Sequence, residues 1–153
     1  MSEPAAPLPD DRRRPRLTYL VKRLEMAERA RLEEVLRPLG VTVHQYTALS
    51  ILERRDGLSS AQLARRHFVT AQAMNQMVAA MERDGLIVRQ PDPMNRKILR
   101  VSLTERGWDV LRACHEGAED LERRMLAALT PAQIAAFRSA LEVSLVAISD
   151  PTL

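Results

Sequence analysis

Apolar residues recur at three- and four-residue intervals along most of this chain, so each such segment has an apolar face and a polar face. This spacing is typical of helices that pack on a core. It predicts helices over residues 16–37, 43–55, 70–84, 105–129 and 131–148. Gly107 and Gly117 are expected to weaken the helix over 105–129 locally.

Polar and turn residues mark where several of these helices begin and end. Ser59, followed three positions later by Gln62, forms a capping box that predicts a further short helix over 60–67. The same pattern precedes the helix that starts at residue 131. Thr70 is expected to cap the helix that follows it, and Gly85 supplies the left-handed position after that helix.

Two short segments depart from the helical pattern and predict a β-hairpin. Residues 86–89 are rich in β-branched side chains, residues 91–95 have turn chemistry, and residues 98–103 alternate between apolar and polar. Arg96 and Lys97 fall near the tip of this hairpin. A short helix, a tight turn, a longer helix and then a hairpin is the order of a winged helix-turn-helix. We therefore expect a mainly α fold (α+β) with such a lobe at residues 43–104.

The composition excludes several classes of protein. Apolar residues make up 46% of the chain, so a core can be buried and wholesale disorder is excluded. Aromatic residues make up only 3%, which argues against a lectin or a base-stacking surface for single strands. The single cysteine, Cys114, excludes an intramolecular disulfide and a zinc site with two thiolates. No uninterrupted apolar run approaches 18 residues and no secretory signal is present, so we expect a cytoplasmic protein without a membrane span.

Positive charge is concentrated in two blocks. Residues 12–37 carry nine bases and four acids, and residues 59–104 carry seven bases and three acids. Residues 105–153 carry five bases and eight acids, so the C-terminal third is acidic. A positive block can meet a polyanion while the rest of the surface does not. Blocks of this size also occur by chance in arginine-rich chains, so charge alone leaves nucleic-acid binding as one of two interpretations.

The polar face of the helix over 70–84 carries side chains suited to reading DNA bases. Amides of Gln and Asn can form two hydrogen bonds with adenine, and an alanine methyl can contact the methyl of thymine. The N-terminus of the preceding helix can hold a phosphate, and cationic side chains at a hairpin tip can enter the minor groove. The predicted DNA contacts are Ser60, Thr70, Gln72, Ala73, Asn75, Gln76, Arg96 and Lys97. An ordinary solvated polar face is the alternative.

Three strings in this part of the chain, SAQLARR, TAQAMNQMVAAMERDGLIVR and DPMNRKILRVSLTERG, resemble the MarR (multiple antibiotic resistance regulator) family of bacterial transcription factors. The last string is the most specific, because it joins the hairpin turn to a Leu-Thr-x-x-Gly sequence. The string VTVHQYTALSIL resembles the family's second helix, and the resemblance covers residues 16–148. Met94 stands at a wing position where family members often have arginine, which leaves Arg96 and Lys97 as the bases of the wing and bears on how deeply the wing engages DNA. Gln76 stands where many members have arginine, which predicts a different preferred base and fewer phosphate contacts.

The resemblance implies a homodimer that binds an inverted-repeat operator as a repressor. In this scheme residues 16–148 form a single domain, in which residues 16–42 and 105–148 form a helical dimerisation base. Residues 1–15, with four prolines, are expected to be a flexible arm, and residues 149–153 a tail. Apolar stripes on the terminal helices, which a lone lobe could not bury, support the dimer.

Family members also commonly respond to small aromatic acids or phenols, bound in a cleft between the base and the lobe. The candidate ligand-binding residues here are Tyr19, Arg23, His44 and Tyr46, since arginine beside a phenol or imidazole suits an aromatic anion. Packing or surface contact is the alternative for each of them. Cys114 is expected to be buried and unreactive, and Cys114 and His115 face different sides of a helix, which argues against a zinc site.

Other functions have less support. A winged-helix module for protein–protein interaction, or a regulator without a small-molecule ligand, remains open. No phosphate-binding loop, metalloprotease motif, nucleophile elbow or apolar carboxylate pair is present, so we expect neither an enzyme nor a cofactor or metal. The sequence leaves the ligand, the operator, the regulated genes and the sign of regulation undetermined.

Overall fold

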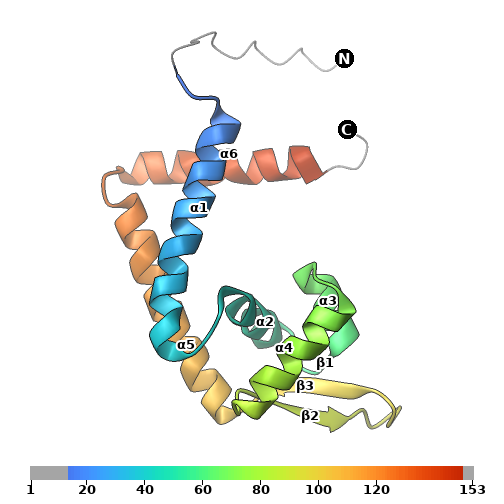
Figure 1. Cartoon of the computed structure of the whole chain (residues 1–153). Coiled ribbons are helices and arrows are strands. Elements are labelled where there is room, and N and C mark those ends of the chain that lie inside the picture. Colours follow the sequence, from blue (N-terminus) through green and yellow to red (C-terminus); the bar gives the residue numbers. More distant parts are fainter. Residues whose placement is uncertain (1–13, 150–153) are drawn as a thin grey trace, which may run out of the picture.

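The computed structural model describes residues 14–149 (Figure 1). The helices are α1 (Leu17–Leu36), the 3-10 helix η1 (Arg37–Leu39), α2 (Val43–Arg54), α3 (Ser60–His67), α4 (Ala71–Arg83), α5 (Glu105–Leu126) and α6 (Pro131–Ser149). The strands are β1 (Leu58–Ser59), β2 (Ile87–Pro91) and β3 (Leu99–Leu103). Every helix and strand expected from the sequence is present, which confirms the mainly α fold. Most of the expected arm and tail lies outside the described residues, and Ser149 belongs to α6 rather than to a tail.

The molecule has a long helical part and a winged lobe at one end of it (Figure 1). We call the helical part the arm; it is distinct from the flexible N-terminal arm expected over residues 1–15. Helices α1 and α5 pack along each other and form the arm, and α6 lies at the end of the arm away from the lobe. Helices α2, α3 and α4 and the small sheet form the lobe. This arrangement places the predicted DNA contacts and the terminal helices at opposite ends of the chain's fold.

The core of the lobe is built from the apolar faces that the sequence pattern predicted. Leu49 and Leu52 of α2, Leu63 of α3 and Met74 and Val78 of α4 are fully buried. The Ser59 capping box is present with both hydrogen bonds, to and from Gln62. The predicted box at Thr130 and Gln133 before α6 has the same two bonds. A third box, formed by Thr42 and Gln45 at the start of α2, was not anticipated. These caps fix where α2 and α3 begin and therefore how they cross.

A three-stranded antiparallel sheet in the order β1-β3-β2 completes the lobe. Its central strand β3 pairs with β2 through Val88↔Ser102 and Gln90↔Arg100, among others, and with β1 through Leu58↔Val101. Strand β1 was not predicted, because two residues are too few to show an alternating pattern. The hairpin of β2 and β3 projects from the lobe as the wing (Figure 1).

Gly107 and Gly117 have a different role from the one expected. A Cβ atom at Gly107 would overlap the carbonyl oxygen of Leu86, and one at Gly117 would overlap the Val35 side chain. The missing side chains therefore allow α5 to approach the turn before β2 and to pack closely on α1. Neither glycine interrupts α5, which is continuous from Glu105 to Leu126.

Helix α6 has no buried residue within this chain. Val143, Leu145, Val146 and Ile148 are all more than 60% exposed. The helix is long and apolar enough to cross a membrane by length and mean hydropathy, even though no uninterrupted apolar run reaches 18 residues. Arg138 and Glu142 lie in its middle, where charges oppose membrane insertion. Apolar surface of this extent is typical of sites where another molecule binds.

Candidate nucleic-acid interface

The two helices of the helix-turn-helix meet at a turn that the sequence locates but does not fully explain. Helix α3 ends at His67, and the next residue, Phe68, caps it with a left-handed backbone at φ +57° and ψ +40°. Thr70 then begins α4, and its hydroxyl accepts a hydrogen bond from the Ala73 amide at 3.1 Å. The predicted cap is therefore confirmed. Because its hydroxyl oxygen serves as a cap, Thr70 fixes the start of α4 in addition to any role at DNA.

The polar face of α4 is open to solvent. Gln72, Ala73, Asn75 and Gln76 are all exposed, whereas Met74 is fully buried on the opposite side. The carbonyl oxygen of Asn75 accepts a hydrogen bond from the Ser60 hydroxyl at 2.5 Å. That bond joins the first residue of α3 to the middle of α4. It leaves the Asn75 amino group and one lone pair of its oxygen available for a base edge.

An ion pair joins α4 to the wing. The Nε and terminal nitrogen of Arg89 donate to one carboxylate oxygen of Glu82 at 3.0 and 2.5 Å. Hydrogen bonding from Arg89 holds the pKa of Glu82 below its usual value, so the pair is charged at neutral pH. Since Glu82 is on α4 and Arg89 is on β2, this pair sets the position of the wing relative to the helix.

The wing tip is ordered by two polar side chains. One oxygen of Asp92 accepts from the Met94 amide at 2.7 Å, and the other accepts from Arg100 Nε at 2.7 Å. The Met94 bond and the Arg100 contact together lower the pKa of Asp92. Asn95 accepts from the Lys97 amide at 3.2 Å. Such local side-chain bonds stabilise turns, so the tip has a defined shape.

The two predicted cations of the wing are available for binding. Arg96 and Lys97 are exposed, and within residues 14–149 neither side chain forms an ion pair or a hydrogen bond. Met94 at the same tip is 91% exposed. The role of Arg100 was missed by sequence reasoning. An acid and a base on either side of the turn, Asp92 and Arg100, could have indicated this ion pair. The alternation of apolar and polar residues, from which the strand was predicted, gives no information about such a pair.

The four candidate ligand residues are divided into two groups. The Arg23 guanidinium lies 5.9 Å from the centre of the Tyr19 ring, near the far end of α1. His44 lies at the lobe, where its ring nitrogen is 3.3 Å from Arg29 and its ring is 5.3 Å from that of His67. About ten residues of helix separate Tyr19 from Arg29, roughly 15 Å along α1. Within one chain, Tyr19 and Arg23 therefore do not reach His44 at the lobe.

Tyr46 takes part in a polar chain between the lobe and the arm. Its hydroxyl lies 2.8 Å from Nδ1 of His115 on α5, and Nε2 of His115 lies 2.9 Å from a carboxylate oxygen of Glu53. Burial raises the pKa of Tyr46, so its phenol stays protonated at neutral pH. This chain connects α2 with α5 and was not expected from the sequence, because its members are far apart along the chain.

Cys114 and His67 both make contacts inside the chain. Cys114 is fully buried, and burial raises the pKa of its thiol to about 11, so it is not a thiolate at neutral pH. Nε2 of His67 lies 2.8 Å from the carbonyl oxygen of His44, which links α3 to α2. In the part of the chain that the structure describes, no three His, Cys, Asp or Glu residues are grouped as metal ligands.

Comparison with known proteins agrees with this architecture. Residues 39–98 match the model of the MarR family. The HTH-type transcriptional repressor Rv2887 of Mycobacterium tuberculosis is 34% identical over 126 residues, which cover 82% of this chain and 91% of that protein. The HTH-type transcriptional repressor IacR of Pseudomonas putida is 24% identical over 82% of this chain and 75% of its own length.

Solved structures show the same fold. A structure of Rv2887 in complex with DNA superposes with a TM-score of 0.73 at 32% identity, over 84% of this chain and 97% of that one. A structure of Rv2887 in complex with salicylic acid gives a TM-score of 0.69 at 34% identity, over 88% and 98% of the two chains. Escherichia coli MarR, at 23% identity, has a TM-score of 0.75 and supports the fold alone. With a winged lobe of this geometry and a relative that is 34% identical over nine-tenths of its length, the chain belongs to the MarR family of transcriptional regulators.

Proposed function

We propose that this protein is a repressor that binds double-stranded DNA at an inverted-repeat operator as a homodimer and is released by a small aromatic ligand. The observation that carries the proposal is the exposed amide face of α4 beside a wing whose tip holds unpaired Arg96 and Lys97. The relative Rv2887, which has been solved with DNA, shares this fold over nearly its whole length.

Helix α4 is suited to the major groove. Its N-terminal half presents amides and methyl groups and no carboxylate, so nothing on this face repels the phosphates that line the groove. Gln72 and Gln76 are one turn apart on the exposed side, where both can reach base edges. Arg96 and Lys97 would contact the adjacent minor groove or its phosphates, since their charge is not neutralised within the chain.

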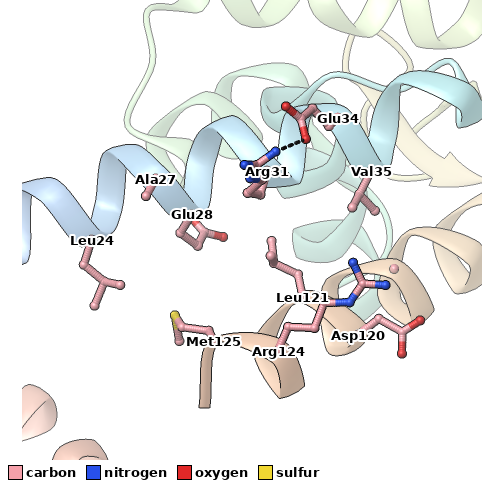
Figure 2. A pocket seen from close by; sticks show the side chains of 11 residues that line it. Leu24, Ala27, Glu28, Arg31, Glu34, Val35, Asp120, Leu121, Arg124 and Met125 are labelled. Carbon is pink, nitrogen blue, oxygen red and sulfur yellow. Dashed lines mark hydrogen bonds and ion pairs between the residues drawn. The ribbon is translucent and has the colours of Figure 1, made fainter. Parts of the chain in front are cut away.

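Exposed apolar surface at the far end of the arm supports the homodimer. Besides α6, the first half of α1 exposes Leu17, Tyr19 and Val21, each by more than half of its side chain. A groove of about 510 Å³ lies between α1 and α5. Figure 2 shows the apolar side chains of Leu24, Leu121 and Met125 in its lining, beside charged ones such as Glu28 and Arg124. A second copy of this chain can cover these surfaces with its own terminal helices, which leaves the two winged lobes free.

Two lobes related by a two-fold axis would read two half-sites. A symmetric dimer presents its two α4 helices in opposite directions along the duplex, so the operator should be an inverted repeat with half-sites about one helical turn apart. The affinity then depends on the distance between the two α4 helices, which a small rotation of the lobes against the base would change.

The contacts between arm and lobe suggest where a ligand could act. The Arg29–His44–His67 contacts and the Tyr46–His115–Glu53 chain both join the lobe to the arm. An aromatic carboxylate that pairs with Arg29 or with an imidazole there would change these contacts and hence the lobe orientation. Tyr19 and Arg23 could contribute to such a site only from the other subunit or at a separate place on the base. The salicylic acid complex of Rv2887 supports this class of ligand.

The proposal is tested by selecting duplexes from a random library with the purified full-length protein. The selected sequences should share an inverted repeat, and salicylate should reduce retention of that duplex. Selection of no common sequence would contradict DNA-specific function and favour the protein-interaction alternative. A common sequence without internal symmetry would contradict binding as a symmetric dimer. If salicylate left the retention of the duplex unchanged, release by an aromatic ligand would be contradicted.

A further inference from the structure

A hollow of about 440 Å³ lies on the winged lobe, where the C-terminal ends of α2 and α3 meet. The residues that line it, which we call the arginine hollow, are Ile51, Arg54, Arg55, Arg66 and Phe68. Three arginines and two apolar residues therefore border one volume, and none of the five residues is acidic. Arg89 and Arg100 on the wing, by contrast, are each paired with a carboxylate.

Phe68 is not explained by folding. Its side chain is 94% exposed, and it is the only residue other than glycine with positive φ in the described part of the chain. Exposure of a phenyl ring and a left-handed backbone are both unfavourable in the folded state. A glycine would meet the backbone requirement of this turn without either penalty. A ring kept at such a position is available to contact something outside the chain.

The three arginines of the hollow also lack internal partners. Within residues 14–149, none of Arg54, Arg55 and Arg66 forms an ion pair or a side-chain hydrogen bond. All three are exposed and lie at or next to helix C-terminal ends, which accounts for their position in sequence but leaves their donors unused. Guanidinium groups bind carboxylates through two parallel hydrogen bonds, so the hollow is prepared for an anion.

The hollow is separate from the predicted DNA-reading face. Ser60 contacts Asn75 of that face, whereas Arg66 is six residues further along the same helix. That separation corresponds to about 9 Å along the helix and roughly 240° around it. The hollow also shares no residue with the Arg29–His44–His67 contacts.

We propose that the arginine hollow binds a small planar aromatic anion, as a second ligand site apart from the cleft between base and lobe. The ligand ring would stack on Phe68 beside Ile51, and its carboxylate would accept hydrogen bonds from the guanidinium of Arg66 and from an arginine of α2. The volume is within the range of small-molecule sites. The ligand class rests on the proposed function; the site itself rests on these five residues. Phe68 stands two residues before Thr70, so a bound ring would lie close to the start of α4.

The site can be tested by NMR on the full-length protein labelled with ¹⁵N, following the arginine Nε–Hε signals during titration with sodium salicylate. Signals of Arg54, Arg55 and Arg66, assigned through single Arg→Ala variants, should shift and saturate. Phe68→Gly and Arg66→Ala should each weaken this binding at least tenfold. Arg65→Ala, an exposed arginine on the same helix outside the hollow, is the matched control and should bind like the wild type.

Two further probes separate an aromatic site from a general anion site. Sodium cyclohexanecarboxylate, which lacks a planar ring, and sodium phosphate should each bind at least tenfold more weakly than salicylate. Because glycine suits the left-handed turn, the Phe68→Gly variant should unfold at a temperature no lower than the wild type, which excludes misfolding as the cause of lost binding.

Several results would overturn the proposal: unshifted signals of the three arginines, salicylate affinity unchanged in Phe68→Gly, or phosphate binding as tight as salicylate binding. The last result would assign the hollow to phosphate groups, such as those of a DNA backbone. The selection of an operator from random duplexes is carried out without an aromatic acid. A negative result of the salicylate titration would therefore leave the proposed DNA-binding function standing.

Discussion

Single residues define the places where this fold departs from regular geometry. The hydroxyls of Ser59, Thr70 and Thr104 begin α3, α4 and α5, and all three could be predicted because a polar cap before an apolar stripe is a local signal. The role of Gly107 could not be predicted, because its cause is a contact with Leu86 that is distant in sequence. The left-handed backbone of Phe68 was missed for the opposite reason: a phenylalanine gives no signal for positive φ.

Gly107 explains the Leu-Thr-x-x-Gly string physically. Thr104 caps α5 through the Gly107 amide at 2.9 Å and donates its hydroxyl to the carbonyl oxygen of Gly85 at 2.5 Å. Replacing Gly107 with Ala would force a methyl group into the Leu86 carbonyl, so the free energy of unfolding should fall by about 3 kcal/mol or more. Urea denaturation measures this. Ala113→Gly on the same helix is a control for helix propensity and should cost only about 1 kcal/mol. Equal losses in the two variants would contradict the close approach.

Gln72 tests base reading at the scale of one side chain. Replacement with Ala should reduce affinity for the selected operator by roughly 1–3 kcal/mol per lost base contact, with little effect on random duplex. Fluorescence anisotropy with both duplexes at one salt concentration gives the two values. If the affinity for both duplexes falls by the same factor, Gln72 does not read bases.

Elements of the lobe act through their positions relative to each other. The order of α3, α4 and the wing could be predicted from periodicity and turn chemistry, since each element has a pattern of its own. The ion pairs that hold these elements in place, Glu82 with Arg89 and Asp92 with Arg100, could not be predicted, because ion pairs leave no periodic pattern in the sequence. The wing is therefore an ordered element whose tip presents Arg96 and Lys97 on a rigid base.

The wing predicts a salt effect. Replacing Arg96 and Lys97 together with Ala should weaken binding to operator and random duplex alike, because contacts with phosphates carry no sequence information. The slope of log K against log salt should become shallower by about 1.8 if each cation neutralises one phosphate. Arg112→Ala, an exposed arginine on α5 outside the lobe, should leave the slope unchanged. An unchanged slope in the wing variant would show that the wing does not contact DNA.

The whole molecule has more apolar surface than one chain can bury. Helix α6 and the first half of α1 both expose apolar side chains, and both lie away from α4 and the wing (Figure 1). The apolar stripes were visible in the sequence, but periodicity alone does not identify the surface that covers them; the expectation of a second copy came from the family resemblance. In the proposed dimer, one end of the molecule would associate with its partner and the other end would read DNA.

Helix α6 therefore provides a test of assembly. Replacing Val143 and Val146 with Asp should convert the dimer into a monomer, because both side chains are at least two-thirds exposed in one chain and would be buried in the dimer. Sedimentation velocity measures the change, and circular dichroism should show the helices retained. A variant that sediments as the wild type would place the interface elsewhere on the chain.

The most direct test of the central claim is the affinity of the full-length protein for duplex DNA from upstream of its own gene, compared with a scrambled duplex of the same length and composition, over a series of salt concentrations. The account predicts that the upstream duplex binds at least about a thousandfold more tightly, and that both affinities fall steeply as salt rises. Equal affinity for the two duplexes, or affinity that does not depend on salt, would contradict it.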